Sequence, residues 1–272
     1  MTFTKEQLKT NVEITWCPGC PNFLILESVK RTIAKLISES EGKIKKEDFA
    51  IVTGIGCHAK IFDYLDLSGI YGLHGRVLPL ATGIKLGNRK LNVLGFSGDG
   101  DAYAEGMEHF IHSCRYNSDM TYIVHDNRAF SLTTGQATPT SQQGYKTKAE
   151  PFGEMHEPIN PVKLALVSGA TFVARCNAKD IEHTAEIIEK AIKHKGFAFI
   201  EIIQNCLIFN VEDNIDKVMY KLPDNKNDME KAMKLASEWN YNSHTSNDKV
   251  PIGIFYQVNK PTFEEKWEKA CS

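Results

Sequence analysis

The sequence lacks both a charge imbalance and a long apolar run. Its 272 residues contain 32 Lys and Arg against 34 Asp and Glu, which gives a formal net charge of -2. This balance offers no electrostatic basis for binding nucleic acid, which needs clustered basic side chains. No apolar run approaches the roughly 20 residues of a membrane-spanning helix, and none typical of a secretory signal follows Met1. We therefore expect a cytoplasmic protein that binds neither nucleic acid nor membrane.

Internal repeats and low-complexity tracts are also absent, which excludes solenoid and array architectures. The chain is long enough for one large core or for a domain with an extension. Residues 211–272 are rich in Asp, Asn, Lys and Glu and offer little apolar area of their own. We expect a domain over residues 1–210 and a C-terminal extension over 211–272 that packs on it as an arm. Within this arm, the pattern predicts a helix at 229–239 and a strand at 252–256.

Short, mostly continuous apolar runs predict the strands of a buried parallel sheet. They lie at residues 49–53, 91–96, 120–125, 170–174 and 197–203. Helical periodicity lies between them, and the first periodic segment follows Asn22, which we expect to cap that helix. Alternating strands and helices imply right-handed βαβ units. They predict an α/β fold with a mostly parallel twisted sheet and helices on both faces. Ligands of such folds bind at the carboxyl ends of the strands.

A Gly-rich turn that follows one of these strands carries two carboxylates. Gly98 and Gly100 let the backbone approach a ligand closely, and a helix that starts here presents free N–H groups to phosphate. Asp99 offers the hard oxygen ligand that Mg2+ prefers, while Asp101 is expected to cap the helix. Asn127 follows the next strand and reaches the same sheet edge. The pattern predicts a site for a metal diphosphate.

The connection over residues 128–160 has little periodicity and several Gly and Pro residues. Loops of this length are usually functional or disordered. Because this one comes directly after Asn127, we expect it to fold over the bound ligand.

Seven cysteines are present, and the pattern of four of them indicates a redox or metal site. Cys17 and Cys20 form a Cys-x-x-Cys pair, which in a reducing cytosol is more often a metal or redox site than a disulfide. Cys57 and Cys206 each follow a predicted strand, so both loops emerge at the carboxyl edge of the sheet. Four thiolates that converge there suit a [4Fe–4S] cluster. A structural zinc site and a thioredoxin-like dithiol are the alternatives. Two other thiols are expected to be inert and buried, namely Cys114 and Cys176.

Several segments resemble those of a known enzyme family. The turn at 98–100 together with Asn127 is similar to the motif of thiamin-diphosphate enzymes. Five segments narrow the resemblance to the beta subunit of 2-oxoacid:ferredoxin oxidoreductases, namely 16–20, 54–57, 73–76, 98–106 and 133–140. The resemblance covers roughly residues 14 to 210 and is specific in combination. It implies a thiamin-diphosphate-binding fold.

The resemblance implies three cofactors, which are thiamin diphosphate, Mg2+ and a [4Fe–4S] cluster. The cofactor-binding positions are Gly56, Cys57, His58, His74, Gly98, Asp99, Gly100, Asp101, Asn127, Thr133, Thr134 and Gln136. The cluster ligands are Cys17, Cys20, Cys57 and Cys206, and the Mg2+ ligands are Asp99, Asn127 and the carbonyl of Ala129. His74 and Arg76 lie beside the cofactor in this family, and a guanidinium suits carboxylate or phosphate recognition. Lys60 is a further candidate to meet a substrate carboxylate.

The implied activity is oxidative decarboxylation of a 2-oxoacid, or the reverse carboxylation, with coenzyme A as acyl acceptor. Electrons pass through the cluster to ferredoxin. A separate alpha subunit supplies the pyrimidine half of the cofactor site in this family, so we expect an α2β2 or larger assembly and no activity of this chain alone. The alternatives are a non-oxidative thiamin-dependent decarboxylase subunit and a cluster-carrying scaffold without catalysis. The choice of 2-oxoacid and the direction of flux stay open, because selectivity is partly built by the partner.

The chain departs from the family pattern at several positions. Pro21 stands where glycine usually follows the second cysteine, and His58 replaces a small hydroxyl residue. Asp126 replaces the first of a common Asn-Asn pair, and Arg128 and Ser131 are also atypical. These differences bear on the environment of the cluster and on the substrate range.

Overall fold

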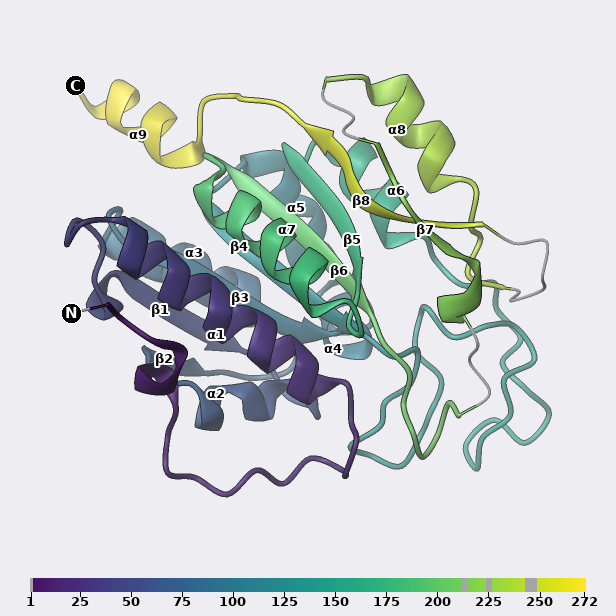
Figure 1. Cartoon of the computed structure of the whole chain (residues 1–272). Coiled ribbons are helices and arrows are strands. Elements are labelled where there is room, and N and C mark those ends of the chain that lie inside the picture. Colours follow the sequence, from purple (N-terminus) through teal and green to yellow (C-terminus); the bar gives the residue numbers. More distant parts are fainter. Residues whose placement is uncertain (1, 212–214, 224–226, 243–248) are drawn as a thin grey trace.

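The computed structural model describes residues 2–211, 215–223, 227–242 and 249–272 (Figure 1). Within these ranges, eight strands form one sheet in the order β2-β1-β3-β4-β6-β5-β8-β7. The strands are β1 (Phe49–Thr53), β2 (Ser68–Tyr71), β3 (Asn92–Gly98), β4 (Met120–Asp126), β5 (Phe172–Asn177), β6 (Phe197–Ile203), β7 (Met219–Lys221) and β8 (Val250–Gln257). Hydrogen-bonded neighbours run parallel except β8, which is antiparallel to β5.

Helices cover both faces of the sheet (Figure 1). One face carries α1 (Asn22–Glu39), α2 (Ile61–Tyr64) and α7 (Ile181–Lys193). The other carries α3 (Val77–Gly87), α4 (Asp99–Tyr103), α5 (Met107–Tyr116), α6 (Pro161–Val167) and α8 (Met229–Ala236). The last helix is α9 (Phe263–Cys271), and short 3-10 helices are η1 (Lys5–Leu8), η2 (Lys46–Asp48), η3 (His58–Lys60) and η4 (Ile215–Val218).

The two helical layers explain why the strands read as continuous apolar runs. Every residue of β1, β4 and β6 is buried, because side chains that alternate between the two faces meet a helix on either side. All four residues of β2 are exposed, since it lies at an edge of the sheet. The predicted α/β fold with a mostly parallel sheet is confirmed. No helix of the described ranges is both long and apolar enough to span a bilayer.

The sequence predicted the five central strands within a few residues of their observed bounds, as well as β8 and α1. The predicted burial of Cys114 and Cys176 is confirmed, since both are 0% exposed. The expected N-cap at Asn22 is wrong. The cap position belongs to Pro21, and Asn22 is the first helical residue with its side chain turned inward. The helix predicted at 229–239 ends at Ala236.

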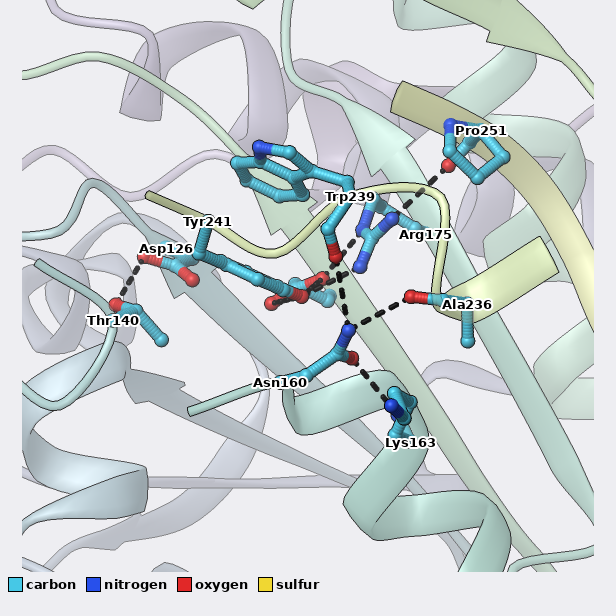
Figure 2. Close-up of polar contacts among 10 residues, drawn as sticks. Asp126, Thr140, Asn160, Lys163, Arg175, Ala236, Trp239, Tyr241 and Pro251 are labelled. Carbon is cyan, nitrogen blue, oxygen red and sulfur yellow. Dashed lines mark hydrogen bonds and ion pairs between the residues drawn. The ribbon is translucent and has the colours of Figure 1, made fainter. Parts of the chain in front are cut away.

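The C-terminal segment extends the sheet through β8 and β7 and is tied to the domain by a buried polar cluster (Figure 2). Arg175 on β5 and Glu201 on β6 form an ion pair of 2.6 Å with both side chains 0% exposed. The hydroxyl of Tyr241 donates to Glu201 at 2.8 Å. Asn160 donates to the carbonyls of Ala236 and Trp239 at 2.8 and 3.1 Å. These bonds hold the segment around Tyr241 against the sheet.

Candidate functional site

A pocket of about 490 Å³ opens at the carboxyl ends of β1, β3 and β4. It is formed by the loops that follow these strands, including the long connection between β4 and α6. The predicted site positions that line it are Gly56, Cys57, His58, His74, Gly98, Asp99, Gly100, Asp101, Asn127, Ala129, Thr133 and Gln136. Residues far apart in the sequence thus meet at the edge where parallel sheets bind their ligands.

The turn between β3 and α4 forms one wall of this pocket. Gly98 is the N-cap of α4, and Asp99 is its first residue. A side chain cannot replace Gly100, because an added Cβ would lie 2.2 Å from the Phe130 ring. Asp99 is only 2% exposed and accepts a hydrogen bond of 3.2 Å from the Thr140 hydroxyl. Burial raises the pKa of Asp99 to about 6, so this carboxylate is held in a place where a cation would favour its charge.

Oxygen atoms from the β4 loop face the same region. Asn127 and Ala129 both line the pocket. The amide oxygen of Asn127 accepts bonds from the Ala129 N–H at 3.1 Å and the Ser131 hydroxyl at 3.3 Å. These bonds fix the turn that brings Asn127 and Ala129 to the pocket that Asp99 also lines.

Asp126 is a second buried carboxyl beside Asp99. It is 0% exposed, and the Thr140 hydroxyl that reaches Asp99 also lies 2.9 Å from its Oδ1 atom. The backbone N–H of Arg128 donates to the same oxygen at 3.0 Å. Burial, followed by the charge of Asp99, raises the pKa of Asp126 well above its ordinary value. This pair was not predicted as a unit from the sequence.

Asp101 does not cap α4, and that prediction is wrong. It lies inside the helix and accepts a hydrogen bond of 2.7 Å from the Gly75 N–H. Its Oδ2 atom stands 3.5 Å from Nε2 of His58. Burial opposes its ionisation, yet the nearby His58 imidazole holds the pKa of Asp101 below its ordinary value. Asp101 therefore joins the loops after β1 and β2 to the turn after β3.

Four predicted residues occupy less central places. His74 lines the pocket and is exposed. Arg76 is absent from the lining residues, and its guanidinium donates to the carbonyls of Gly75 and Glu105 at 3.3 and 3.0 Å. Thr134 is exposed with a φ of 81° and is likewise not a lining residue. Lys60 donates to the Thr15 carbonyl at 3.3 Å and lines a second pocket instead.

This second pocket of about 170 Å³ is lined by Cys17, Cys20, Cys57 and Cys206. All four are free thiols. The Trp16 indole anchors the surrounding loops by donating to the Cys57 carbonyl at 2.6 Å, and the Phe209 N–H lies 3.4 Å from the Cys206 sulfur. In the described parts of the chain, no group of three or more His, Cys, Asp or Glu residues is arranged to hold a metal ion. The thiols line a cavity rather than meet at one point.

Burial raises the pKa of two of these thiols, Cys57 and Cys20, and so favours their protonated form in the chain by itself. The pKa of Cys57 rises to about 11 through burial and, next, through the Cys20 thiol. The pKa of Cys20 is also raised by burial, although the backbone and side-chain amides of Asn22 act in the opposite direction. A cationic group in the pocket would favour the thiolates, because metal binding displaces their protons.

The two pockets share a wall, whose members are Cys57, Asn127, Ser131, Leu132 and Gln204. Asn22 lines the cysteine pocket and His125 lines the larger one. The Asn22 amide oxygen accepts hydrogen bonds from His125 Nδ1 at 2.8 Å and from Gln204 Nε2 at 3.1 Å. This contact could not be predicted from the sequence, because the three residues come from α1, β4 and the loop after β6.

The chain matches two family models. Residues 54–202 match the C-terminal TPP-binding domain of thiamine pyrophosphate enzymes, and residues 209–271 match the C-terminal part of the pyruvate ferredoxin oxidoreductase beta subunit. The fold and the site therefore define a domain of the thiamin-diphosphate enzyme class.

Individual relatives narrow the class. A 2-oxoacid:ferredoxin oxidoreductase subunit beta of Saccharolobus solfataricus is 43% identical over 89% of this chain and 81% of its own length. The 2-oxoglutarate synthase subunit KorB of Methanocaldococcus jannaschii is 34% identical over 93% and 91%. A 2-oxoglutarate:ferredoxin oxidoreductase from Magnetococcus marinus, solved with 2-oxoglutarate, coenzyme A and succinyl-CoA, superposes with a TM-score of 0.90 at 34% identity, covering 98% of this chain and 89% of its own.

The chain belongs to the beta subunits of 2-oxoacid:ferredoxin oxidoreductases. The family predicted from the sequence is confirmed, and so is its oxidoreductase activity, in preference to a non-oxidative decarboxylase or a scaffold. The name of the family also implies a partner subunit in a larger complex.

Proposed function

We propose that this subunit binds thiamin diphosphate and Mg2+ in the larger pocket and a [4Fe–4S] cluster in the cysteine pocket. One observation carries the proposal: the two pockets are adjacent, and Cys57, Asn127 and Gln204 line both. A cofactor and a redox centre on opposite sides of one wall are close enough for electrons to pass between them. The oxidative chemistry of the family requires such proximity.

Asp99, Asn127 and the Ala129 carbonyl would hold Mg2+. All three line the pocket and together supply oxygen ligands of the kind that Mg2+ prefers. The buried Asp99 carboxylate, with its raised pKa, would regain favourable electrostatics from a divalent cation. The predicted roles of Gly98 and Gly100 in the approach of the diphosphate fit the absence of room for a Cβ at Gly100.

Cys17, Cys20, Cys57 and Cys206 would ligate the cluster. A zinc ion draws four sulfurs to about 2.3 Å from one point, whereas a four-iron cluster occupies the space between its thiolates. Four thiols around a cavity of about 170 Å³ fit the second case. Asp101 and His58 tie the loop of Cys57 to the turn of Asp99, so this chain would hold both groups in one frame.

When bound, the thiamin cofactor supplies the carbanion chemistry for decarboxylation and the cluster accepts electrons one at a time. The residues of this chain bind and orient. His74 lies at the mouth of the larger pocket, and we assign Lys60 and Arg76 to substrate carboxylate recognition. The current hydrogen bonds of Lys60 and Arg76 go to backbone carbonyls, which a carboxylate can replace as a stronger partner.

We further propose that an alpha subunit completes the thiamin site in an α2β2 or larger cytoplasmic assembly. Coenzyme A would accept the acyl group, and ferredoxin would receive the electrons. The solved relative with 2-oxoglutarate and coenzyme A bound supports this assignment of substrates. Turnover of a 2-oxoacid by this chain alone, without a partner, would contradict the need for an alpha subunit.

The experiment that tests the proposal measures iron, acid-labile sulfide and zinc in anaerobically purified protein, with an electron paramagnetic resonance (EPR) spectrum after reduction. About four iron and four sulfide per chain are expected. Cys17→Ser should lower both contents, whereas Cys271→Ser, at an exposed cysteine outside the pocket, should not. Zinc in place of iron, or equal iron in the two variants, would refute the ligand assignment.

A separate titration tests the thiamin site. Thiamin diphosphate should bind the complex more tightly with Mg2+ than without it, and Asp99→Ala should abolish the difference. An unchanged dependence on Mg2+ in this variant would refute the assignment of Asp99.

A further inference from the structure

The wall between the two pockets contains a buried hydrogen-bond chain that reaches from one pocket to the other. Asn22 stands at its centre and is 1% exposed. On the side of the larger pocket, His125 Nδ1 donates to the Asn22 amide oxygen at 2.8 Å and Gln204 Nε2 donates to it at 3.1 Å. On the other side, Asn22 lines the cysteine pocket together with Cys20.

The orientation of this chain is determined by its donors. The amide oxygen of Asn22 is occupied by His125 and Gln204, so the NH2 group of the same amide is the donor left to face the cysteine pocket that Asn22 lines. The imidazole of His125 is 1% exposed, and its Nε2 atom has no hydrogen-bond partner among the residues that the structure describes. Among the described residues, the His125 ring therefore forms its hydrogen bond with Asn22 alone. Because His125 is part of β4, this bond holds the Asn22 amide in a defined position.

We propose that Asn22 is a positioning residue that directs an N–H group into the cysteine pocket, at the sulfurs of the cluster, and that His125 holds it in place. The inference rests on the proposed four-cysteine cluster. N–H donors to ligand sulfurs favour the reduced, more negative state of an iron–sulfur cluster and raise its reduction potential. Asn22 and His125 would thus raise the reduction potential of the cluster, and they would do so from the wall that separates it from the thiamin cofactor.

The test uses the anaerobically purified complex with its partner subunit. Midpoint potential, EPR spectrum, iron and sulfide are compared for Asn22→Leu, His125→Phe and the double variant. Asn22→Leu keeps the side-chain size and removes the N–H donor, so we expect a lower midpoint potential and shifted EPR g values at unchanged iron content. His125→Phe should lower the potential by less, and the double variant should match Asn22→Leu, because His125 acts through Asn22.

Ser28→Ala is the matched control. Ser28 is a buried polar residue of the same helix whose hydroxyl donates to the carbonyls of Leu24 and Ile181, away from the cysteine pocket. Its loss should leave the potential unchanged. If Asn22→Leu fails to keep the cluster, His125→Phe decides, since it leaves the cysteine pocket lining intact.

An intact cluster with an unchanged potential in Asn22→Leu, or in His125→Phe where that variant decides, overturns the inference and leaves the proposed function standing. Additive shifts in the double variant overturn the role of His125 as the support of Asn22. A lack of any cluster in the unaltered complex overturns the proposed function, and this inference with it.

Discussion

Replacing Asp99 by Asn should stabilise the chain when it is free of metal and cofactor. The carboxyl is 2% exposed, and burial raises its pKa from 3.8 to about 6. Each pKa unit is worth about 1.4 kcal/mol, so an ionised Asp99 costs the folded chain about 3 kcal/mol. Asparagine has the same shape and no charge to bury. We therefore expect Asp99→Asn to raise the free energy of unfolding at pH 8 by up to about 3 kcal/mol.

The pH dependence gives the sign of this effect an independent check. Because the folded pKa lies above the unfolded one, the folded chain keeps a proton on Asp99 over a pH range in which the unfolded chain has lost it. Stability is therefore lost as the pH rises from 3.8 toward about 6, and the loss is complete above that. The advantage of Asp99→Asn should be about 3 kcal/mol at pH 8 and roughly half of that at pH 5, which lies about midway between the two pKa values.

Urea unfolding in the presence of a chelator measures the difference. With a slope near 3 kcal/mol per molar urea, the midpoint at pH 8 should rise by up to about 1 M. Asp66→Asn is the control, because Asp66 is an exposed carboxylate paired with Lys46, and its loss should change stability by less than about 0.5 kcal/mol. Equal midpoints for Asp99→Asn and the unaltered chain at pH 8, or an advantage as large at pH 5 as at pH 8, would refute the reasoning.

Saturating thiamin diphosphate and Mg2+ should reverse the order of stability. A ligand at about 1,000 times its Kd stabilises the folded state by about 4.1 kcal/mol, which exceeds the advantage of about 3 kcal/mol, and Asp99→Asn should lose this gain because its amide offers no charge to the cation. Stability would then be sacrificed at Asp99 for the binding of a metal, and the reversal would demonstrate it directly.

Three further changes test other parts of the structure. Gly100→Ala should abolish thiamin diphosphate binding in calorimetry with a native circular dichroism spectrum, because its Cβ would meet the Phe130 ring at 2.2 Å; retained affinity would contradict the close approach. Arg175→Met should lower the free energy of urea unfolding by about 3–5 kcal/mol, because it leaves Glu201 buried without its ion pair; a loss below 1 kcal/mol would speak against this anchor. His194 is 4% exposed with its pKa lowered to about 4 by burial, so the folded chain loses stability as the pH falls from 6.5 toward 4. His194→Gln should reduce that loss, of about 3 kcal/mol, in unfolding curves at pH 7 and pH 4.5, and an equal loss in both proteins would disprove the role of His194.

The sequence was most informative where local chemistry and a buried strand coincide. The turn around Asp99 and the loop of Cys57 follow β3 and β1, and their apolar runs already indicate on which edge of the sheet these residues emerge. Parallel topology then brings them together without any further information. The edge strand β2 and helix α3 were missed, because β2 is entirely exposed and has no buried apolar run to mark it.

Side-chain contacts between distant elements were beyond the sequence pattern. Asn22 and Asp101 both stand near a helix start, and the propensity of their residue types for N-caps predicts a local hydrogen bond. In the fold each forms long-range bonds instead, Asn22 with His125 and Asp101 with Gly75. A polar residue at a helix start that also borders a pocket thus forms hydrogen bonds with distant residues around the pocket instead of capping its own helix.

The two atypical residues Asp126 and Arg128 become intelligible only as a pair. Asp126 places an extra carboxyl behind Asp99, where burial and the charge of Asp99 raise its pKa. The Arg128 side chain is 2% exposed, and its positive charge acts on Asp126 in the opposite direction. Its guanidinium also lies 5.9 Å from the centre of the Trp239 ring, within the range of a cation–π contact. The positive charge of Arg128 thus partly offsets the extra carboxyl of Asp126, and the contact of Arg128 with Trp239 connects this pair to the C-terminal segment. A change at Asp126, Arg128 or Trp239 should therefore alter the electrostatics of the proposed metal site.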